Sequence, residues 1–269
     1  IYVILKNIKY WRLFMKKRFL VLSFLLFIFY SLNLLAINFP EKANKVEDFI
    51  PKGWKTLIIK KGDLNKDKIE DIVLVIQKND PKNFRKAESG YVYIPMDNAN
   101  FNPIIILVLF KDKNSKYSLV GKNEDGFIVS EGKAHEEVLE ELYSPNFDED
   151  LSDSISIKNN TLRIHTFYEF VRGMSSTEYV FRYQNNRFEL IGLEVNDGGV
   201  SGDYLESNNY SINFSTKKLI KARETSRIDG DDKKEEKTVK DIDVEHKYIL
   251  DTMTENTRGE ILEKYVYEH

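Results

Sequence analysis

The chain has no cysteine and only four histidines among its 269 residues. Without cysteine the protein can form no disulfide, no thiol nucleophile and no thiolate-bound metal site, and no lipid can be attached to a cysteine during export. The histidines are His135, His165, His246 and His269. Several acids follow His135, but no second histidine lies one helical turn later, so this stretch predicts a solvated helix face rather than a zinc site.

Several catalytic signatures are also missing. The chain contains no G-x-S-x-G elbow, no P-loop and no G-x-G-x-x-G after a predicted strand. The glycine-rich residues 198–203 lie between predicted strands, where a loop is expected rather than a phosphate site. Acidic residues are abundant, yet the sequence nominates no pair as general acid and base. We therefore predict no catalytic residue and favour a non-enzymatic protein, and the sequence neither shows nor disproves an enzyme.

The residues that are present are typical of a folded, exported domain. Hydrophobic residues make up 42% of the chain and charged residues 31%, which is a globular composition. The first methionine is Met15, so residues 1–14 are interpreted as an upstream extension of the reading frame. Residues 15–36 predict a signal peptide, with basic residues at 16–18, an apolar run at 19–32 and Ala36 before the cleavage point. The competing interpretation is an uncleaved anchor in the inner membrane through residues 19–36.

The charge distribution bears on the partners. Residues 1–36 contain six Lys or Arg and no Asp or Glu, so the rest of the chain is more acidic than the whole, whose net charge is −3. An acidic surface argues against nucleic acid and against an anionic membrane surface as partners. We expect a periplasmic or secreted protein with an unidentified envelope or extracellular partner, and membrane attachment only if the signal is uncleaved.

Residues 63–71 carry the one motif that points to a specific chemistry. Oxygen-bearing side chains occupy positions 1, 3, 5 and 9 of this stretch, in Asp63, Asn65, Asp67 and Asp71. Ca²⁺ binds six to eight oxygens at about 2.3–2.6 Å, and alternate residues of a tight loop can direct oxygens to a common centre. The backbone carbonyl of Ile69, at position 7, adds a ligand. The motif predicts Ca²⁺ as cofactor; the competing interpretation is a polar hairpin turn whose side chains cap their own backbone amides.

The loop resembles the beginning of an EF-hand, but Leu74 stands at position 12, where an EF-hand has a bidentate glutamate. A better resemblance is to FG-GAP and VCBS-type repeats, whose G-D-x-N-x-D-G-x-x-D loop joins two antiparallel strands of a propeller-like blade. Gly62 and the four side-chain ligands match this pattern, whereas Lys68 replaces its second glycine. The resemblance implies calcium at the end of one hairpin, with a left-handed backbone at Lys68 that costs about 1 kcal/mol. It covers one unit and not a complete propeller.

Apolar runs and alternation predict a mainly β protein. Strands are expected at 54–60, 69–77, 104–110, 117–120, 154–158, 162–170, 177–184, 187–195, 210–214 and 219–223. The pairs at 159–160 and 185–186 predict two-residue turns, so consecutive hairpins should form a meander. Short helices are expected at 41–50, 132–143 and 260–267. Residues 78–102 and 196–209 are expected to be irregular, and the charge-dense 224–240 to be a solvated turn or flexible segment.

A second resemblance covers most of residues 45–223. The segments 181–184, 188–192 and 211–216 resemble uncharacterised exported bacterial proteins that carry the same G-D-L-N-x-D loop, which implies no known activity. We predict an antiparallel meander sheet or sandwich with propeller-blade-like hairpins and a few short helices. A β-rich domain should span 37–223, and a charged segment with a C-terminal helix should span 224–269. The expected function is an exported module with a structural Ca²⁺ loop and a cell-envelope partner; an exported hydrolase that acts on an envelope polymer through acidic residues is the alternative.

Overall fold

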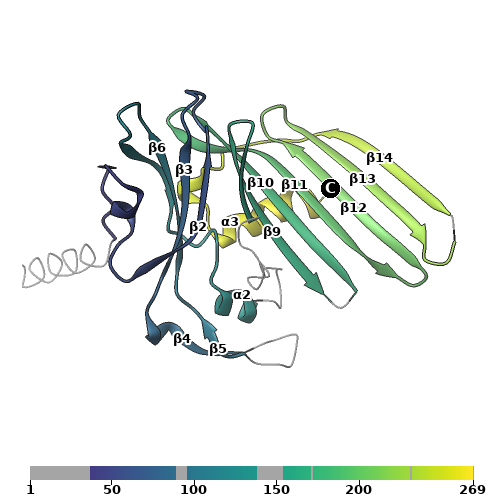
Figure 1. Ribbon diagram of the computed structural model, residues 1–269. Helices are drawn as coiled ribbons and strands as arrows, with labels where there is room; N and C mark the ends of the chain where they lie inside the picture. Colours follow the sequence, from purple (N-terminus) through teal and green to yellow (C-terminus); the bar gives the residue numbers. More distant parts are fainter. Residues whose placement is uncertain (1–36, 89–95, 138–153, 171, 231, 269) are drawn as a thin grey trace, which may run out of the picture. The chain divides into compact units, whose positions relative to one another are not determined.

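The computed structural model describes residues 37–88, 96–137, 154–170, 172–230 and 232–268 (Figure 1). The chain divides into two compact units, Ile1–Phe39 and Pro40–His269, and every element described below belongs to the second. The predicted upstream extension and signal peptide, residues 1–36, lie outside the described residues. Among the described residues, no helix is both long enough and apolar enough to span a membrane.

The second unit is mainly β, as predicted, and its strands pair antiparallel. A five-stranded sheet has the order β1-β7-β6-β3-β2, a seven-stranded sheet has the order β14-β13-β12-β11-β10-β9-β8, and β4 pairs with β5. The strands are β1 (Lys42–Ala43), β2 (Trp54–Gly62), β3 (Asp71–Lys78), β4 (Phe84–Ala87), β5 (Met96–Asn100), β6 (Ile104–Lys111), β7 (Tyr117–Asn123), β8 (Ile155–Lys158), β9 (Thr161–Phe170), β10 (Gly173–Gln184), β11 (Arg187–Ser201), β12 (Tyr204–Asn213), β13 (Lys218–Arg227) and β14 (Lys233–Asp241). The helical elements are η1 (Val46–Phe49), η2 (Pro81–Asn83), α2 (Glu131–Glu137), η4 (Leu250–Thr252), α3 (Glu255–Leu262) and η5 (Glu263–Tyr267).

Strands β3 and β6 form the centre of the five-stranded sheet. Residues 71–77 of β3 and 104–109 of β6 are buried on both faces, which explains why these strands are continuous apolar runs rather than alternating ones. The β4–β5 hairpin is inserted between them in the sequence, while β3 and β6 pair directly in the sheet. The predicted irregular segment 78–102 therefore contains a small hairpin in its described part, whereas residues 89–95 lie outside the described residues.

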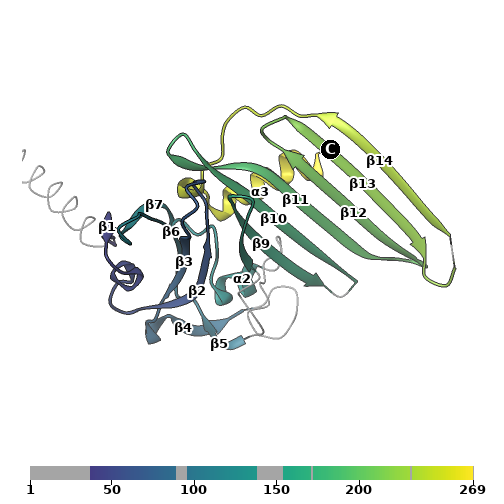
Figure 2. The same ribbon diagram turned by 45° about the horizontal axis from the view of Figure 1, so that its top comes forward.

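The seven-stranded sheet is a simple meander, because its spatial order follows the sequence from β8 to β14 (Figure 2). The predicted two-residue turns are confirmed: Asn159, Asn160, Asn185 and Asn186 all have positive φ, between 52° and 59°. Such left-handed pairs match the twist of a hairpin, and Asn tolerates this backbone better than most residues. Alternation along β9 is confirmed where side chains are described, since residues 162, 164 and 166 are buried and 163, 165 and 167 are half-buried.

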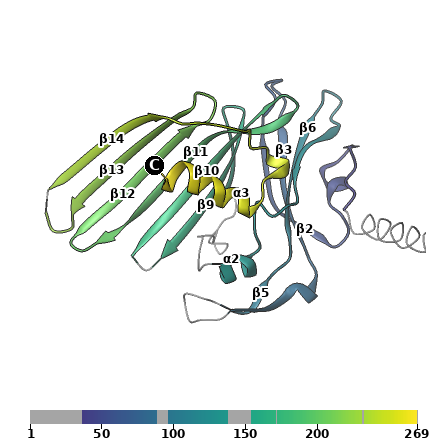
Figure 3. The ribbon, with the colours of Figure 1, turned by 180° about the vertical axis from the view of Figure 1, so that it is seen from behind.

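Both large sheets contribute to one hydrophobic core. It contains Val73 and Val108 from the five-stranded sheet together with Leu193 and Ile212 from the seven-stranded sheet. The C-terminal helices α3 and η5 lie against one face of the seven-stranded sheet, as the opposite views of Figures 1 and 3 show. Their buried side chains in that core are Ile261, Tyr265 and Val266. The helices thus supply the second layer that the middle of this sheet needs to bury its apolar face.

Two predictions of irregular structure are wrong. Residues 196–209 belong to β11 and β12, which pair from Gly192 with Asn213 to Ser201 with Tyr204. Residues 224–240 belong largely to β13 and β14, so the sheet extends beyond residue 223. The Gly, Asn, Ser and charged side chains there predict loops, but they sit on the solvated faces of a ladder whose backbone pairing does not depend on them. All nine residues of the edge strand β14 are exposed, and its Lys and Glu side chains suit an unpaired edge.

The predicted helices are shorter than expected or shifted. In residues 41–50 only η1 is helical, because an isolated ten-residue helix is barely stable. Strand β1, in the same segment, pairs with β7 instead. The helix predicted at 132–143 is α2 up to Glu137, and its remainder lies outside the described residues. The helix predicted at 260–267 begins earlier, at Glu255, where Thr254 caps the helix by accepting from the Thr257 amide at 3.1 Å.

Candidate functional site

The 63–71 loop connects the end of β2 to the start of β3, so all five predicted metal ligands lie on one hairpin connection. Gly62 and Asp71 are the last paired residues of the two strands. The loop is held on two sides, because the Leu64 side chain enters the hydrophobic core and Asn160 Nδ2 donates to the Asp63 carbonyl at 2.8 Å. The structure therefore brings the predicted ligands together in a loop with fixed ends.

The polar side chains of the loop accept hydrogen bonds from the loop's own backbone. Asp63 Oδ1 accepts from the Lys66 amide at 2.6 Å, and Asp63 Oδ2 accepts from the Lys68 amide at 3.0 Å. Asn65 Oδ1 accepts from the Asp67 amide at 2.9 Å, and Asp67 Oδ1 accepts from the Ile69 amide at 2.7 Å. These are the short-range bonds that Asp and Asn make in tight turns. Each oxygen has a second lone pair, so these bonds leave capacity for a cation.

Two lysines of the loop have left-handed backbones. Lys66 has φ of 70° and Lys68 has φ of 68°. The second value is the conformation expected at the position where FG-GAP-type loops have glycine. A non-glycine residue pays about 1 kcal/mol for this region. The Asp63 carboxylate accepts from both lysine amides, so one side chain holds both strained residues in place.

Asp71 differs from the other predicted ligands because it is fully buried. Its Oδ2 accepts from the Leu64 amide at 2.9 Å, and its Oδ1 accepts from the Lys111 amide at the end of β6 at 3.1 Å. Burial raises the pKa of Asp71 from 3.8 to about 6, the charges of Asp67 and Asp63 add to the increase, and the two amide hydrogen bonds oppose it. Asp71 therefore joins the base of the loop to the neighbouring strand.

The donor set has the chemistry of a hard-cation site, with three carboxylates, one amide oxygen and one carbonyl. In the described part of the chain, no three His, Cys, Asp or Glu side chains gather in a geometry that could hold a metal ion. Asp63, Asn65 and Asp67 face the loop's own amides, and Asp71 faces the amides of Leu64 and Lys111. The loop geometry is therefore that of a capped turn, which agrees with the competing interpretation and leaves metal binding a prediction.

Comparison of the chain with protein-family models, with curated proteins and with solved structures found no match.

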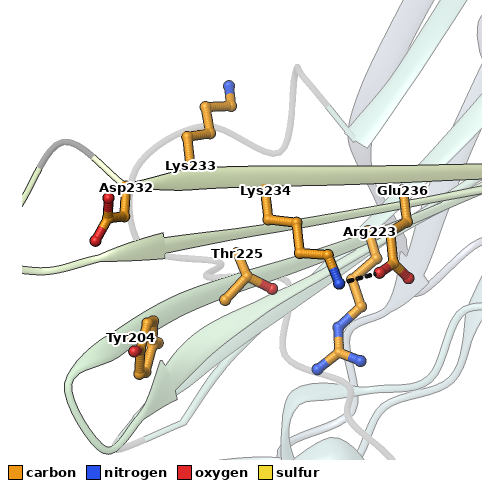
Figure 4. Close-up of a pocket in the computed structure, with 7 residues that line it drawn as sticks. All are labelled: Tyr204, Arg223, Thr225, Asp232, Lys233, Lys234 and Glu236. Carbon is orange, nitrogen blue, oxygen red and sulfur yellow. Dashed lines mark ion pairs between the residues drawn. The ribbon is translucent and has the colours of Figure 1, made fainter.

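A shallow cavity of about 390 Å³ lies on one face of the outer strands β12, β13 and β14 (Figure 4). Its cations are paired: Lys234 pairs with Glu236 at 2.5 Å, Arg223 with Glu206 at 3.0 Å and Lys233 with Glu224 at 2.9 Å. Figure 4 shows Lys233 projecting to the opposite side of β14 from Lys234, as strand alternation requires. Exposed, internally paired charges of this kind offer little to a ligand.

A buried carboxylate that no sequence motif predicts is Glu189, on β11. It is 2% exposed, and it accepts from Gln184 at 2.6 Å, Asn185 at 3.1 Å, Arg187 at 2.9 Å and Lys247 at 2.9 Å. Burial alone would raise the pKa of Glu189, but the bonds from Lys247, Gln184, Asn185 and Arg187 outweigh it and lower the pKa to about 2. Three of these donors lie in the same hairpin and could have been noticed in the sequence, whereas Lys247 lies 58 residues away.

Proposed function

We propose that the protein is an exported, non-enzymatic binding module whose 63–71 loop takes up Ca²⁺ as a structural ion. Asp63, Asn65, Asp67 and Asp71 would supply side-chain oxygens, and Ile69 would supply its carbonyl. The ion would stabilise the fold and take no part in a reaction. The support comes from the residues of the loop, their spacing and their mutual electrostatics.

One observation carries the proposal: burial raises the pKa of the Asp71 carboxyl, and two further carboxylates of the same loop lie close enough to add to that increase. The charges of Asp67 and Asp63 both contribute to the raised pKa of Asp71. Like charges held together in this way favour either a proton or a cation among them. At neutral pH Ca²⁺ is the available partner, because hard oxygen ligands select it and extracellular sites bind it at about 0.1–1 mM.

The position of the loop supports a structural role. Asp71 connects β3 to β6 through the Lys111 amide, and Asn160 connects the loop to the turn between β8 and β9. An ion at this point would hold together segments of both large sheets. Its binding energy would add directly to the free energy of unfolding, because the unfolded chain has no assembled site.

The experiment is a pair of thermal melts, in EDTA and in millimolar Ca²⁺, for the wild type and for Asp63→Ala. At about a tenfold excess over the dissociation constant, Ca²⁺ should stabilise the wild type by about 1.4 kcal/mol. Asp63→Ala should be insensitive to Ca²⁺. Asp112→Ala is the matched control, because Asp112 Oδ1 caps the Asn114 and Lys116 amides at 2.8 and 2.9 Å in another hairpin turn. It should lose stability but retain the full Ca²⁺ response.

Equal melting temperatures in EDTA and in Ca²⁺ for the wild type would contradict the proposal and leave the loop a capped turn. A Ca²⁺ response that persists in Asp63→Ala would show that the ion binds elsewhere. Export is a separate part of the proposal. It is tested by sequencing the N-terminus of the protein recovered from cells: a start near residue 37 supports cleavage, and an intact residue 15–36 segment supports the anchored alternative.

The hydrolase alternative has one candidate pair of acids. Glu178 and Glu194 stand directly opposite each other on β10 and β11. Partial desolvation and the Glu178 charge raise the pKa of Glu194, while Arg163 pairs with Glu178. Neither acid lines the cavities of about 390, 640 and 30 Å³ described in this structure, and an exposed sheet face does not exclude water from a reaction. We therefore favour the binding module and expect no release of sugar from envelope polysaccharide; release that Glu194→Gln abolishes would reverse this preference.

A further inference from the structure

The largest of the three cavities, about 640 Å³, lies where the β10–β11 hairpin meets the β12–β13 turn and the segment that follows β14. Its size falls within the range of small-molecule sites, about 300–1,000 Å³. Its lining residues are Arg182, Gln184, Glu189, Leu190, Ile191, Phe214, Ser215, Lys217, Val244, Glu245, His246, Lys247 and Tyr248. None of them belongs to the 63–71 loop, so this cavity is a separate feature.

The walls of the cavity are fixed by backbone hydrogen bonds. Strand β12 pairs with β11 only from Gly192 onward, and the segment near residue 248 occupies the place beside the earlier part of β11. The Leu190 amide donates to the Tyr248 carbonyl at 2.9 Å, and the Ile242 amide donates to the Lys217 carbonyl at 3.0 Å. The cavity is therefore formed before any ligand arrives, which lowers the free-energy cost of binding.

The carboxylates of the cavity are already compensated. Glu189 accepts four hydrogen bonds, two of them from the charged groups of Arg187 and Lys247. Glu245 pairs with Lys264, which is outside the lining, at 3.2 Å. These acids therefore offer little repulsion to a second anion near them.

Two cations of the lining remain without a partner. The side chains of Arg182 and Lys217 form no hydrogen bond or ion pair with any residue in the described part of the chain. Arg182 is half-buried on β10. Lys217 lies in the β12–β13 turn, where its φ is 55°. Asn213 Oδ1 accepts from the Thr216 amide at 2.9 Å and so fixes this turn. A half-buried guanidinium with free donors favours a carboxylate or phosphate, which matches its planar fork.

The rest of the lining is apolar and aromatic. Leu190, Phe214 and Tyr248 are buried, and the rings of Phe214 and Tyr248 meet edge to face with centroids 5.8 Å apart. The exposed His246 ring lies against Tyr248 at 4.5 Å. A ring-bearing ligand could cover these surfaces while its anionic group reaches the cations.

We propose that this cavity binds a small organic oxyanion, an aromatic carboxylate or phosphate, with Arg182 and Lys217 holding the anionic group and the Tyr248 and His246 rings contacting the ring. This site requires no ion in the 63–71 loop. It would give the proposed binding module a ligand class, and ligand binding there does not depend on whether the loop binds calcium.

The test is calorimetric titration of the purified protein with benzoate, phenyl phosphate, inorganic phosphate and benzyl alcohol. Saturable binding is expected for at least one of the two aromatic anions. Whichever of them binds more tightly shows whether the site prefers a carboxylate or a phosphate. Inorganic phosphate has no aromatic ring and benzyl alcohol has no anionic group, so each should bind roughly tenfold more weakly. The affinity should be the same in EDTA and in millimolar Ca²⁺, which separates this outcome from the calcium experiment.

The variants Arg182→Gln and Lys217→Gln should each weaken binding of the aromatic anion about tenfold. Lys218→Gln is the matched control, because Lys218 is the next residue, carries the same charge and pairs with Asp241 at 2.5 Å outside the cavity. Its affinity should stay within about twofold of wild type. Lys217 is exposed, so its replacement should leave the fold intact even if that of Arg182 does not. Absence of saturable binding by both aromatic anions, or equal binding by wild type and Lys217→Gln, would overturn the proposal.

Discussion

Replacing Glu189 with glutamine should lower the free energy of unfolding at neutral pH by about 2–3 kcal/mol and remove part of the protein's acid sensitivity. Glu189 is buried in the wild type and accepts hydrogen bonds from two neutral amides and two charged groups. A glutamine would place an uncharged amide against Lys247 and Arg187, and its own N–H groups would face other donors. The loss therefore combines a broken charge pairing with unsatisfied buried groups.

The magnitude follows from the pKa of Glu189. Its folded-state pKa is about 2, against 4.5 for an ordinary glutamate. At about 1.36 kcal/mol per unit, this difference corresponds to roughly 3 kcal/mol. The side chains of Lys247 and Arg187 are 57% and 41% exposed, so solvent screening should bring the measured value nearer to about 2 kcal/mol.

The direction of the pKa shift determines the pH range over which Glu189 stabilises the protein. A carboxylate with a lowered folded-state pKa stabilises the protein fully above the unfolded value of 4.5, and this contribution is lost as the pH falls toward 2. Urea unfolding of wild type and Glu189→Gln should therefore differ most at about pH 7, and the two should converge at about pH 2–3. Glu224→Gln is the control, because its ion pair with Lys233 is exposed and should contribute about 0–1 kcal/mol.

A difference between wild type and Glu189→Gln that stays constant from neutral to acid pH would refute this reasoning. It would mean that the cost arises from packing and not from ionisation. A loss no larger than that of Glu224→Gln would refute it as well, because the buried hydrogen bonds would then have little net effect.

Three further predictions concern the loop and its surroundings. Lys68→Gly should raise the unfolding free energy by about 0.5–1 kcal/mol in thermal melts, because it relieves a φ of 68°, whereas Lys61→Gly in β2 should lower it. Gly62→Ala should destabilise the protein by about 1–3 kcal/mol in urea, because an added Cβ would stand 2.7 Å from Ile157 Cγ2; an unchanged midpoint would mean that Ile157 moves freely. In EDTA, the raised pKa of Asp71 should make stability fall as the pH rises from about 4 to 6, by roughly 3 kcal/mol, since the neutral form is favoured when folded. Asp71→Asn should remove this slope, and an identical slope in the variant would exclude Asp71 as its source.

The sequence by itself determined the features that depend on neighbouring residues. The paired asparagines at 159–160 and 185–186 are turns because their side chains tolerate a left-handed backbone. The apolar runs of β3 and β6 are central strands because only a doubly covered strand buries every side chain. The alternation around residue 164 and the capped turn at 63–71 are likewise local patterns, and the oxygen spacing that suggests a cation is visible in the primary structure.

Only the tertiary structure decided the features that depend on distant partners. Residues 196–209 and 224–240 have loop-like composition, yet they form strands because neighbouring strands satisfy their backbone groups and their side chains need no burial. Glu189 is a buried ionised group only because Lys247 folds back onto β11, and the cavity beside it exists only where that segment replaces a strand. Asp71 acquires its raised pKa from burial in the folded chain, and the Lys111 amide of the neighbouring strand β6, 40 residues away, opposes this increase. Such long-range contacts leave no periodic signal in a sequence, because they arise from the path of the chain and not from its local preferences.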